Sequence, residues 1–517
     1  MKITRLSLLL IAAAALAACG NGEQTVQIDP ALRFNPDGGV AKTITLLCGA
    51  VVEYTAYEGI YYVTNVEDST YQTLNIYVPS GTGDDAPILL RTYVGGYMAA
   101  KAMEPSATDA TGRALAEGMV VCVPGARGWN SSVERGGATV YTGRAPNALL
   151  DLKAAVRYLR ANDDVIPGSS EKIITDGTSA GGAMSSLLGV TGNAPQYDTY
   201  LEAMGAAKAS DDVFASVCYC PIIDLDHADM AYEWLYSRTN DGIRALTAEQ
   251  KAVSEELAAA YPDYLNSLGL LNPADGTAIT ADNYLDYLKT YIIASAQRAR
   301  DEGCDLPDGI GIITNAPQLP DFGGHGPGAR LPEGAPAGKP RLSGREAPSF
   351  GPGGVTVSRQ QGEFVVDVDW DAYLTYVVST APLKTPPAFD AMGVLGANAT
   401  PENQVFGDST GSAVNFSSYS AAANGASIDE ALAGRVAILN PMNFVDSGQS
   451  VKARHWYIRH GARDRDTAFP VPVNFATKLM NAGYDVDFRL PWNRPHSGDY
   501  NLDDLFEWIH CVAGEWQ

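Results

Sequence analysis

The stretch 172–182, KIITDGTSAGG, constrains the fold more than any other part of the chain. A short segment rich in β-branched residues enters a Gly-x-Ser-x-Gly turn around Ser179, and a helix-compatible run, 183–188, leaves it. Small residues on both sides of a serine let the backbone turn sharply, so that the hydroxyl is exposed at the end of a strand. This order predicts a nucleophile elbow with Ser179 as the nucleophile; the alternative is an ordinary structural glycine turn.

Strand-like and helix-like segments alternate on both sides of this turn. Apolar runs predict strands at 88–93, 119–124, 213–221, 456–460 and 485–491, and amphipathic runs predict helices at 107–117, 145–162, 471–482 and 503–511. Such alternation is typical of a mostly parallel sheet with helices on both faces. Two earlier runs, 51–63 and 70–78, predict antiparallel strands. Together with the elbow, the pattern predicts an α/β fold of the α/β-hydrolase type.

A long insertion interrupts this pattern. We expect a core in two parts, 34–226 and 451–517, and between them an inserted lid domain, 227–450, with helices at 252–261 and 284–300. Its segment 323–354 holds 10 Gly and 6 Pro, which predicts a flexible loop. Because sites of this fold lie at the C-terminal edge of the sheet, we expect the insertion to cover the site.

The N-terminus predicts export. Lys2 and Arg5 precede the apolar run 6–18, which is too short to span a bilayer and is typical of a signal peptide, 1–18. The ending Leu-Ala-Ala-Cys resembles the bacterial lipoprotein processing site, with Cys19 as the lipidated residue and 19–33 as an extended tether. We therefore expect an exported, membrane-anchored lipoprotein; the alternative is ordinary secretion with an unmodified Cys19.

The net charge excludes some classes of partner, and the cysteine content bears on disulfides and metal sites. With 36 basic and 60 acidic residues the net charge is −24, which repels nucleic acid and suits a soluble exported enzyme. The six cysteines besides Cys19 permit disulfides, but Cys122, Cys218 and Cys220 lie in strand-like runs where buried thiols are at least as well expected. We find no convincing set of metal ligands and expect neither metal nor cofactor.

His496 is the best candidate for a base that activates the serine. It lies in a loop after the last expected strand and before the last expected helix, where the chain order Ser…Asp…His of α/β-hydrolases places the base. The other histidines suit structural roles in the insertion, beside a strand or in the closing helix: His227, His325, His455, His460 and His510.

The acid that orients this base should follow the preceding strand. Asp464 stands in that loop, and Asp466 comes two residues later. A carboxylate that accepts from the imidazole Nδ1–H fixes the tautomer and stabilises the imidazolium formed during attack. By position either aspartate could serve, and the alternative role for one of them is to cap the next helix.

Two backbone amides are candidates for an oxyanion hole. The amide of Ala180 follows the serine at a helix N-terminus. The second donor should come from the loop after the first parallel strand, where Gly96 lies in the run VGGY, 94–97. The alternative for this loop is a tight turn without a catalytic role.

On these and further motifs the chain resembles the bacterial tannases of the α/β-hydrolase type (subtype B). The matching motifs spread over residues 50–517: VGGYM (94–98), GTSAGGA (177–183), LKTPPAFD (383–390), ENQVFG (402–407), RDRDT (463–467) and AGYDVDF (482–488). The resemblance implies that Asp464 is the triad acid. It also implies that Lys384, Glu402 and Asp466 hold the three ring hydroxyls of a galloyl group.

We therefore expect a serine esterase that acts on galloyl esters, with galloyl depsides as an extension. Its partner would be a small phenolic ester, because one ammonium and two carboxylates can satisfy three adjacent hydroxyls in a dry pocket. The alternatives are a feruloyl or general carboxylic esterase and, from another class, a catalytically silent hydrolase fold used for binding.

Overall fold

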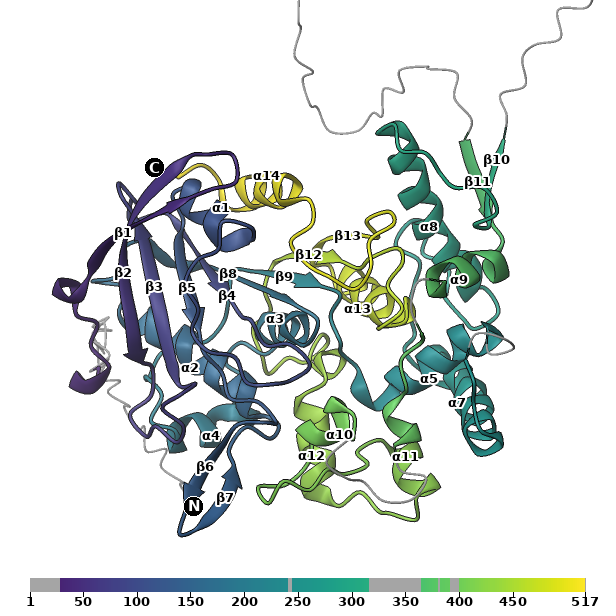
Figure 1. Cartoon of the computed structure of the whole chain (residues 1–517), viewed down its shortest axis with the longest axis horizontal. Coiled ribbons are helices and arrows are strands. Elements are labelled where there is room, and N and C mark those ends of the chain that lie inside the picture. Colours follow the sequence, from purple (N-terminus) through teal and green to yellow (C-terminus); the bar gives the residue numbers. More distant parts are fainter. Residues whose placement is uncertain (1–27, 240–243, 316–363, 380–381, 391–398, 517) are drawn as a thin grey trace, which may run out of the picture.

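The fold is built on one large mixed sheet. The computed structural model describes residues 28–239, 244–315, 364–379, 382–390 and 399–516. Nine strands are hydrogen-bonded in the order β1-β2-β3-β5-β4-β8-β9-β12-β13 (Figure 1). The first three are antiparallel to their neighbours, and from β5 to β13 all neighbours are parallel. This order confirms the α/β-hydrolase fold expected from the sequence.

The strands lie where the apolar runs predict them, within a few residues. Their bounds are β1 (Val40–Thr45), β2 (Val51–Tyr61), β3 (Thr73–Pro79), β4 (Pro87–Arg91), β5 (Val120–Pro124), β8 (Ser169–Thr178), β9 (Ala215–Tyr219), β12 (His455–Arg459) and β13 (Asp485–Arg489). Strand β1, which the sequence pattern did not predict, forms the edge of the sheet beside β2.

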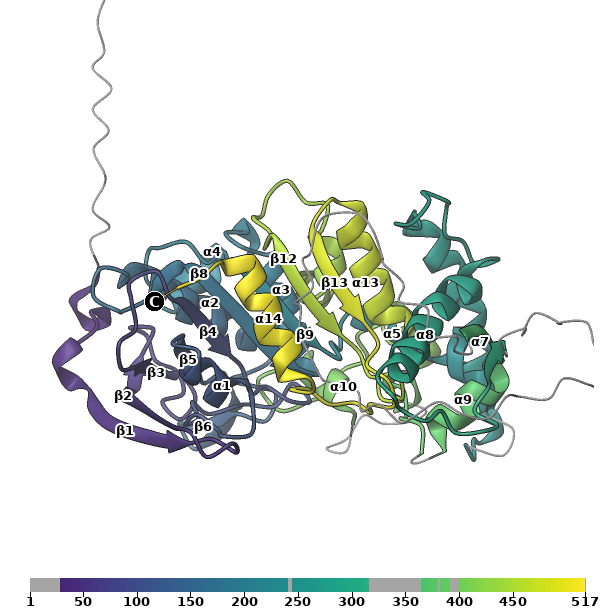
Figure 2. The same cartoon turned by 90° about the horizontal axis from the view of Figure 1, so that it is seen from above.

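Helices cover both faces of the sheet (Figures 1 and 2). Alternate side chains of one strand point to opposite faces, so Ile88 and Leu90 belong to one hydrophobic core and Leu89 to the other. The first core is shared with α2 (Asn147–Ala161), α3 (Ala180–Val190) and α13 (Pro470–Asn481); the second is shared with α1 (Ala110–Ala116) and α14 (Leu502–Ala513). The parallel strands β4, β5 and β9 are therefore buried on both faces, as their continuous apolar runs indicate.

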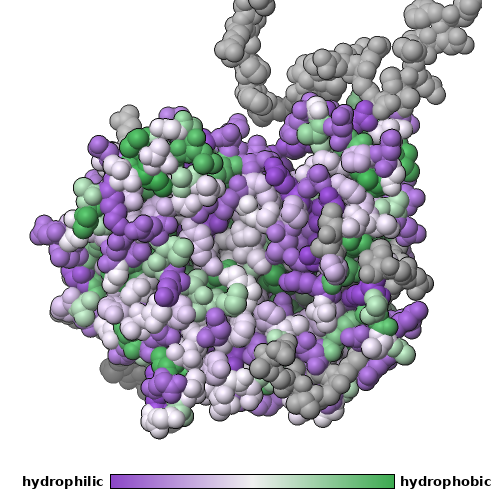
Figure 3. Space-filling view, viewed as in Figure 1, coloured by the Kyte–Doolittle hydropathy of each residue, from purple (hydrophilic) through white to green (hydrophobic). Residues whose placement is uncertain are grey.

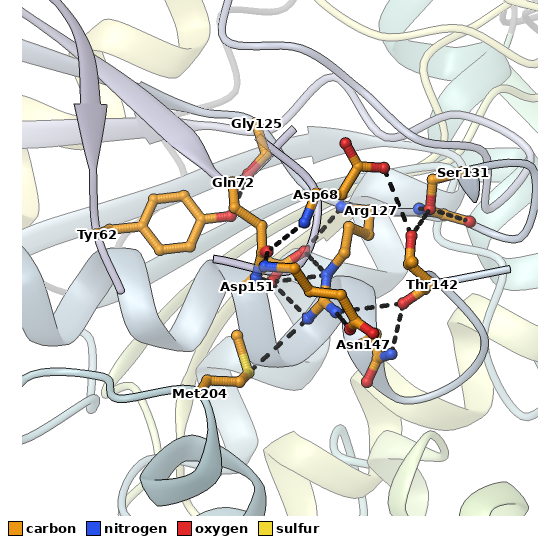
Figure 4. A network of polar contacts seen from close by, with 12 residues as sticks. Tyr62, Asp68, Gln72, Gly125, Arg127, Ser131, Thr142, Asn147, Asp151 and Met204 are labelled. Atoms are coloured by element: carbon orange, nitrogen blue, oxygen red, sulfur yellow. Dashed lines mark hydrogen bonds and ion pairs between the residues drawn. The ribbon is translucent and has the colours of Figure 1, made fainter. Parts of the chain in front are cut away.

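A buried ion pair ties the loop after β5 to helix α2 (Figure 4). Arg127 donates from its backbone amide and its guanidinium to Asp151, and both side chains are almost fully buried. Glu67 accepts from the same guanidinium, and Gln72 donates to the Asp151 carboxylate over 3.1 Å. Every charge in the network thus has a partner, which is the condition for burying charges without a large penalty.

Between β9 and β12 the described residues form helices and a two-stranded antiparallel sheet. The elements are α5 (Leu225–Tyr236), η4 (Ser237–Thr239), α7 (Ala248–Ser267), α8 (Tyr284–Asp301), β10 (Ile312–Asn315), β11 (Phe364–Val368), α9 (Trp370–Val378), η5 (Pro387–Phe389), α10 (Pro401–Val405), α11 (Ser418–Ala423), α12 (Glu430–Ile438) and η6 (Pro441–Asn443). Tyr284 donates to Asn474, and Asn474 to Tyr261, so α7 and α8 are joined to α13 of the core.

One expectation at the surface needs correction, and one hairpin there was not predicted from the sequence. The tether expected over 19–33 does not extend to its end, because Leu32 is only 2% exposed and Asn162 bonds to the backbone of Leu32 and Phe34. An antiparallel hairpin that was not predicted, β6 (Ser132–Arg135) and β7 (Ala138–Tyr141), projects from the core. The signal peptide, Cys19 and the Gly/Pro-rich segment 323–354 lie outside the described residues.

Exposed hydrophobic side chains form small groups, and the cysteines of the described residues form no disulfides. Hydrophobic side chains form only small groups on the face shown in Figure 3, one of them over the β1–β2 end of the sheet, where Leu47 is 81% exposed. None of the described helices combines the length and the apolar composition needed to cross a membrane. The six cysteines among the described residues are free thiols: Cys48, Cys122, Cys218, Cys220, Cys304 and Cys511.

Candidate active site

Ser179 occupies a strained turn between β8 and α3. Its φ of 63° and ψ of −122° are rare for a residue with a side chain, and such strain concentrates at functional sites. The flanking glycines are required sterically: a Cβ on Gly177 would lie 2.3 Å from the carbonyl oxygen of Gly181, and one on Gly182 would lie 2.6 Å from that of Tyr219. The turn has the geometry of a nucleophile elbow.

Three side chains from distant parts of the sequence form a continuous hydrogen-bonded chain. The Ser179 Oγ lies 2.9 Å from His496 Nε2, and His496 Nδ1 lies 2.7 Å from Asp464 Oδ2. Asp464 follows β12, and His496 follows β13. All three therefore stand beyond the C-terminal ends of parallel strands, where the sites of such sheets form.

The environment of Asp464 keeps its carboxylate charged and fixed. Its Oδ1 accepts from the backbone amides of Asp466 and Thr467, at 2.8 and 3.2 Å. Complete burial alone would raise the pKa of Asp464, but the imidazoles of His460 and His496 hold that pKa well below its usual range. Burial opposes charging of His496, yet the Asp464 carboxylate outweighs it and raises the pKa of His496. The pair is thus arranged to stabilise an imidazolium.

The two amides expected to form an oxyanion hole lie in neighbouring loops. Ala180 is the first residue of α3, and Gly96 adopts a φ of 55° in the loop after β4. The two segments touch, since a Cβ on Gly181 would lie 2.8 Å from the carbonyl oxygen of Val94. Among the described residues neither the Ala180 amide nor the Gly96 amide has a hydrogen-bond acceptor, so both are free to bind a substrate oxygen.

A buried cluster that the sequence did not suggest joins two strands and one loop of this site. Arg91, at the end of β4, donates to Asp176 of β8 and holds Asp499 with two hydrogen bonds of 3.0 and 2.6 Å. Asp499 stands three residues after His496, and Asp176 three residues before Ser179. Burial raises the pKa of Asp176 to about 7, against the opposing effect of Arg91. One guanidinium therefore fixes the His496 loop to the nucleophile strand.

A mostly apolar cavity of about 300 Å³ lies beside the triad. The three residues expected to bind substrate, Lys384, Glu402 and Asp466, all line it. Ile222 lines it as well, and the Ile222 amide donates to the carbonyl oxygen of Ser179, so one wall of the cavity is bonded to the backbone of the elbow. The structure thus brings together residues that are far apart in sequence, from β9–α5, from α10 and from the loop after β12.

Hydrogen bonds between loops fix the polar side of the cavity. Tyr232 accepts from the Lys384 amide and donates to the carbonyl oxygen of Arg465. Asn403 of α10 donates to the carbonyl oxygen of Pro387 over 2.9 Å. Burial raises the pKa of Glu402, and the Lys384 ammonium acts in the opposite direction.

Asp229 is a further polar residue of the cavity that sequence reasoning missed. It lies on α5, is 5% exposed and accepts from the Ala388 amide over 2.9 Å. Burial raises the pKa of this carboxyl well above its usual range, against the opposing effect of the hydrogen bond from Ala388. An acidic residue within a helix carries no sequence signal of such burial.

The other histidines fit the structural roles expected of them, with one exception. His455 bonds to Asp485, His227 to Asp224, and His510 contacts Glu117. His460 was expected to be satisfied beside its strand, but neither of its ring nitrogens has a hydrogen-bond partner among the described residues. His325 lies outside them.

Solved structures of bacterial enzymes match this chain over nearly its whole length. A tannase from Fusobacterium nucleatum is 34% identical, with a TM-score of 0.76 over 93% of this chain and 99% of that chain. A tannin acyl hydrolase from Lactobacillus plantarum matches with the same identity, coverage and TM-score, as does a tannin acyl hydrolase in complex with ethyl gallate. The chain belongs to the tannase family.

Two further comparisons agree that this tannase is an ester hydrolase. A family model described as BD-FAE matches residues 74–263, from β3 through the elbow into α7. The esterase LipC of Mycobacterium tuberculosis is 45% identical over 58 residues, which span 11% of this chain and 14% of that protein. The resemblance drawn from the sequence motifs is therefore confirmed at the level of family and fold.

Proposed function

We propose that this tannase is a serine esterase that hydrolyses galloyl esters through an acyl-enzyme and releases gallic acid. The observation that carries the proposal is the position of the Ser179–His496–Asp464 chain beside a cavity whose apolar wall holds one ammonium and two carboxylates. Related tannin acyl hydrolases have been solved with ethyl gallate and with 3,4-dihydroxybenzoate, which supports a phenolic ester as the substrate.

The chemistry follows from the triad. Ser179 Oγ attacks the ester carbonyl while His496 Nε2 takes its proton, and Asp464 stabilises the imidazolium that forms. The amides of Ala180 and Gly96 bind the oxyanion, where one lost donor typically costs a factor of about 10²–10³ in rate. His496 then protonates the leaving alcohol. In the second half, water attacks the acyl group, gives its proton to His496 and releases the acid and free Ser179.

The charged residues of the cavity would recognise the acyl group of the substrate. A galloyl ring offers a flat apolar face and three adjacent hydroxyls, and Lys384, Glu402 and Asp466 provide charged partners for those hydroxyls. An acyl group without hydroxyls would offer these groups no hydrogen bonds in a mostly apolar cavity, which is unfavourable. The residues inserted between β9 and β12 supply Lys384 and Glu402, so we propose that this insertion acts as a lid that completes the site.

A side-by-side hydrolysis panel tests the substrate class. We expect kcat/KM to be highest for methyl gallate, lower for methyl protocatechuate, and lower by several orders of magnitude for methyl ferulate and methyl benzoate. Similar values for all four esters would instead identify a general carboxylic esterase, and a maximum at methyl ferulate a feruloyl esterase.

A further inference from the structure

A buried histidine lies behind the triad with no satisfied ring nitrogen. His460 follows β12 and is 0% exposed, and neither Nδ1 nor Nε2 has a hydrogen-bond partner among the described residues. Its Nδ1 lies 3.5 Å from Oδ2 of Asp464, too far for a good hydrogen bond. Buried polar groups are normally paired, so an imidazole in this position calls for an explanation.

Cys220 brings a thiol to the same place. It follows β9 with a φ of 43°, and its Sγ is hydrogen-bonded to the carbonyl oxygen of Ser497 at 3.3 Å. The Cys220 sulfur, a ring nitrogen of His460 and a carboxylate oxygen of Asp464 all lie within 4.8 Å of one another. The segments that follow β9 and β12 therefore place a thiol, an imidazole and a carboxylate around one point.

This donor set is the one that thiophilic divalent cations prefer. Zn²⁺ is bound by cysteine sulfur, histidine nitrogen and aspartate oxygen, and soft thiolate ligands favour such ions over Mg²⁺ or Ca²⁺. Tetrahedral coordination with bonds of about 2.0–2.1 Å places nitrogen and oxygen ligands about 3.3 Å apart. The Nδ1–Oδ2 separation of 3.5 Å between His460 and Asp464 is close to that value.

We propose that Cys220, His460 and Asp464 form a binding site for a thiophilic divalent cation such as Zn²⁺ or Cd²⁺, and that its occupation inhibits the enzyme. On binding, Cys220 coordinates as the thiolate and His460 as the neutral imidazole, and each releases to solvent the proton it carries, so affinity falls at low pH. The ion is an inhibitor here and takes no part in the hydrolysis.

The cation would inhibit the enzyme because the cation site and His496 share the Asp464 carboxylate. This step rests on the proposed role of Asp464 in catalysis. The Oδ2 atom that faces His460 also accepts from His496 Nδ1 at 2.7 Å. A cation on that oxygen would oppose the positive charge that forms on His496 during attack. Because all three ligands are buried, the ion can enter only when the surrounding loops open locally, and inhibition should develop slowly.

A second cluster of possible ligands provides a control. Asp224, Asp226 and His227 also lie close together, but Asn440 donates to both carboxylates and Tyr264 donates to Asp224. Their oxygens are thus already occupied by donors that a cation would have to displace. We expect His227→Gln to leave cation binding unchanged.

Cd²⁺ titration of a chain without exposed thiols tests binding directly. With Cys19, Cys48, Cys304 and Cys511 changed to serine, ultraviolet charge-transfer absorption should show one Cd–thiolate site per chain. Cys220→Ser and His460→Gln should each weaken binding by at least about 100-fold, since even outer-shell partners of a metal site are commonly worth about 10–100-fold. Cys218→Ser, a buried control on the same strand, should bind as the parent does.

Hydrolysis measured with Zn²⁺ tests inhibition. The parent should lose activity slowly after Zn²⁺ is added and recover it with EDTA. The Cys220→Ser variant should keep its activity in Zn²⁺, measured relative to its own rate without Zn²⁺.

Two results would contradict the cation site: equal Cd²⁺ affinity in the parent and both ligand variants, or no thiolate absorption in the parent. Cation binding without loss of activity would contradict the inhibition. If no ester is hydrolysed at all, the proposed function fails while the titration still decides the site. Should Cys220→Ser not fold, His460→Gln decides.

Discussion

Two aspartates only two residues apart have very different surroundings. The Asp464 side chain is fully buried between two imidazoles, whereas that of Asp466 is 22% exposed, lines the cavity and accepts from Arg465 over 2.8 Å. Environment sets the role of a carboxylate, as in other enzymes with paired acids. We therefore propose that Asp464 orients the base and that Asp466 binds the substrate, a distinction that position in the sequence alone left open.

The first prediction concerns Asp464 and pH. His496 must be neutral to accept a proton, so kcat/KM should rise with pH through the pKa of His496. Because Asp464 raises that pKa, the midpoint of the acid limb should lie above the ordinary histidine value of about 6.5. Asp464→Asn should lower kcat on every ester and move the midpoint to lower pH. An unchanged midpoint in this variant would contradict the proposed pairing.

The second prediction separates recognition from chemistry. Lys384→Ala, Glu402→Ala and Asp466→Ala should each reduce kcat/KM for methyl gallate by about one to two decades, the equivalent of roughly 1.5–3 kcal/mol for a charge-assisted hydrogen bond. On a short activated ester without ring hydroxyls, the same variants should stay close to the parent. Equal losses on both substrates, in proteins shown to be folded, would mean that these residues do not bind the ring hydroxyls.

At the scale of elements, the site depends on how the end of β4, strand β8 and the His496 loop are held together. Arg91 is 4% exposed and joins the end of β4, strand β8 and the His496 loop. The His496 loop also packs tightly on the elbow, since a Cβ on Gly498 would lie 1.9 Å from Oγ1 of Thr178. Small movements of this loop would change the contact between His496 and Ser179.

The third prediction follows from the Arg91 cluster. Arg91→Met would leave the Asp176 and Asp499 carboxylates without their cation, and breaking such a buried pair commonly costs about 3–5 kcal/mol of unfolding free energy. We expect lower stability in urea and a fall in kcat that exceeds any change in KM. The control is Arg113→Met, a more exposed arginine whose pairs should be worth about 0–1 kcal/mol. Equal effects of the two variants would argue against the proposed role.

Sequence patterns predicted the elements of the core better than the contacts between them. Continuous apolar runs and the glycine-rich elbow are local signals, and the parallel strands β4, β5, β8, β9, β12 and β13 form where these signals lie. The pairing of Arg91 with Asp499 joins residues 408 positions apart, and no local pattern encodes it. The edge strand β1, with an exposed outer face, carries little apolar periodicity. The buried Asp229 was missed because its burial depends on the packing of α5 against η5.

At the scale of the whole molecule, the insertion and the core share one site. The cavity is lined from the core by Ile222 and Thr467 and from the insertion by Lys384 and Glu402. The insertion that divides the core in sequence thus supplies part of the cavity lining.

The fourth prediction concerns the attachment of this molecule to a membrane. The sequence before residue 28 predicts lipidation of Cys19, with the described body held outside the cytoplasm. Cys19→Ser should remove the lipid and leave the protein unprocessed or released, because the apolar run 6–18 is shorter than the roughly 18–20 residues of a membrane span. Detergent partitioning of the two forms measures this. Identical partitioning after full processing of both would count against a lipid anchor.

The turnover of methyl gallate by Ser179→Ala protein tests the central claim most directly. The Ser179 hydroxyl is hydrogen-bonded to His496, so its loss should remove the nucleophile and leave the fold and gallate binding nearly intact. We predict that kcat falls by a factor on the order of 10⁴ or more, as expected for a residue of a triad that acts as a unit. The thermal unfolding transition and the gallate dissociation constant should stay close to those of the parent. Turnover at the parent rate would contradict the serine-esterase mechanism altogether.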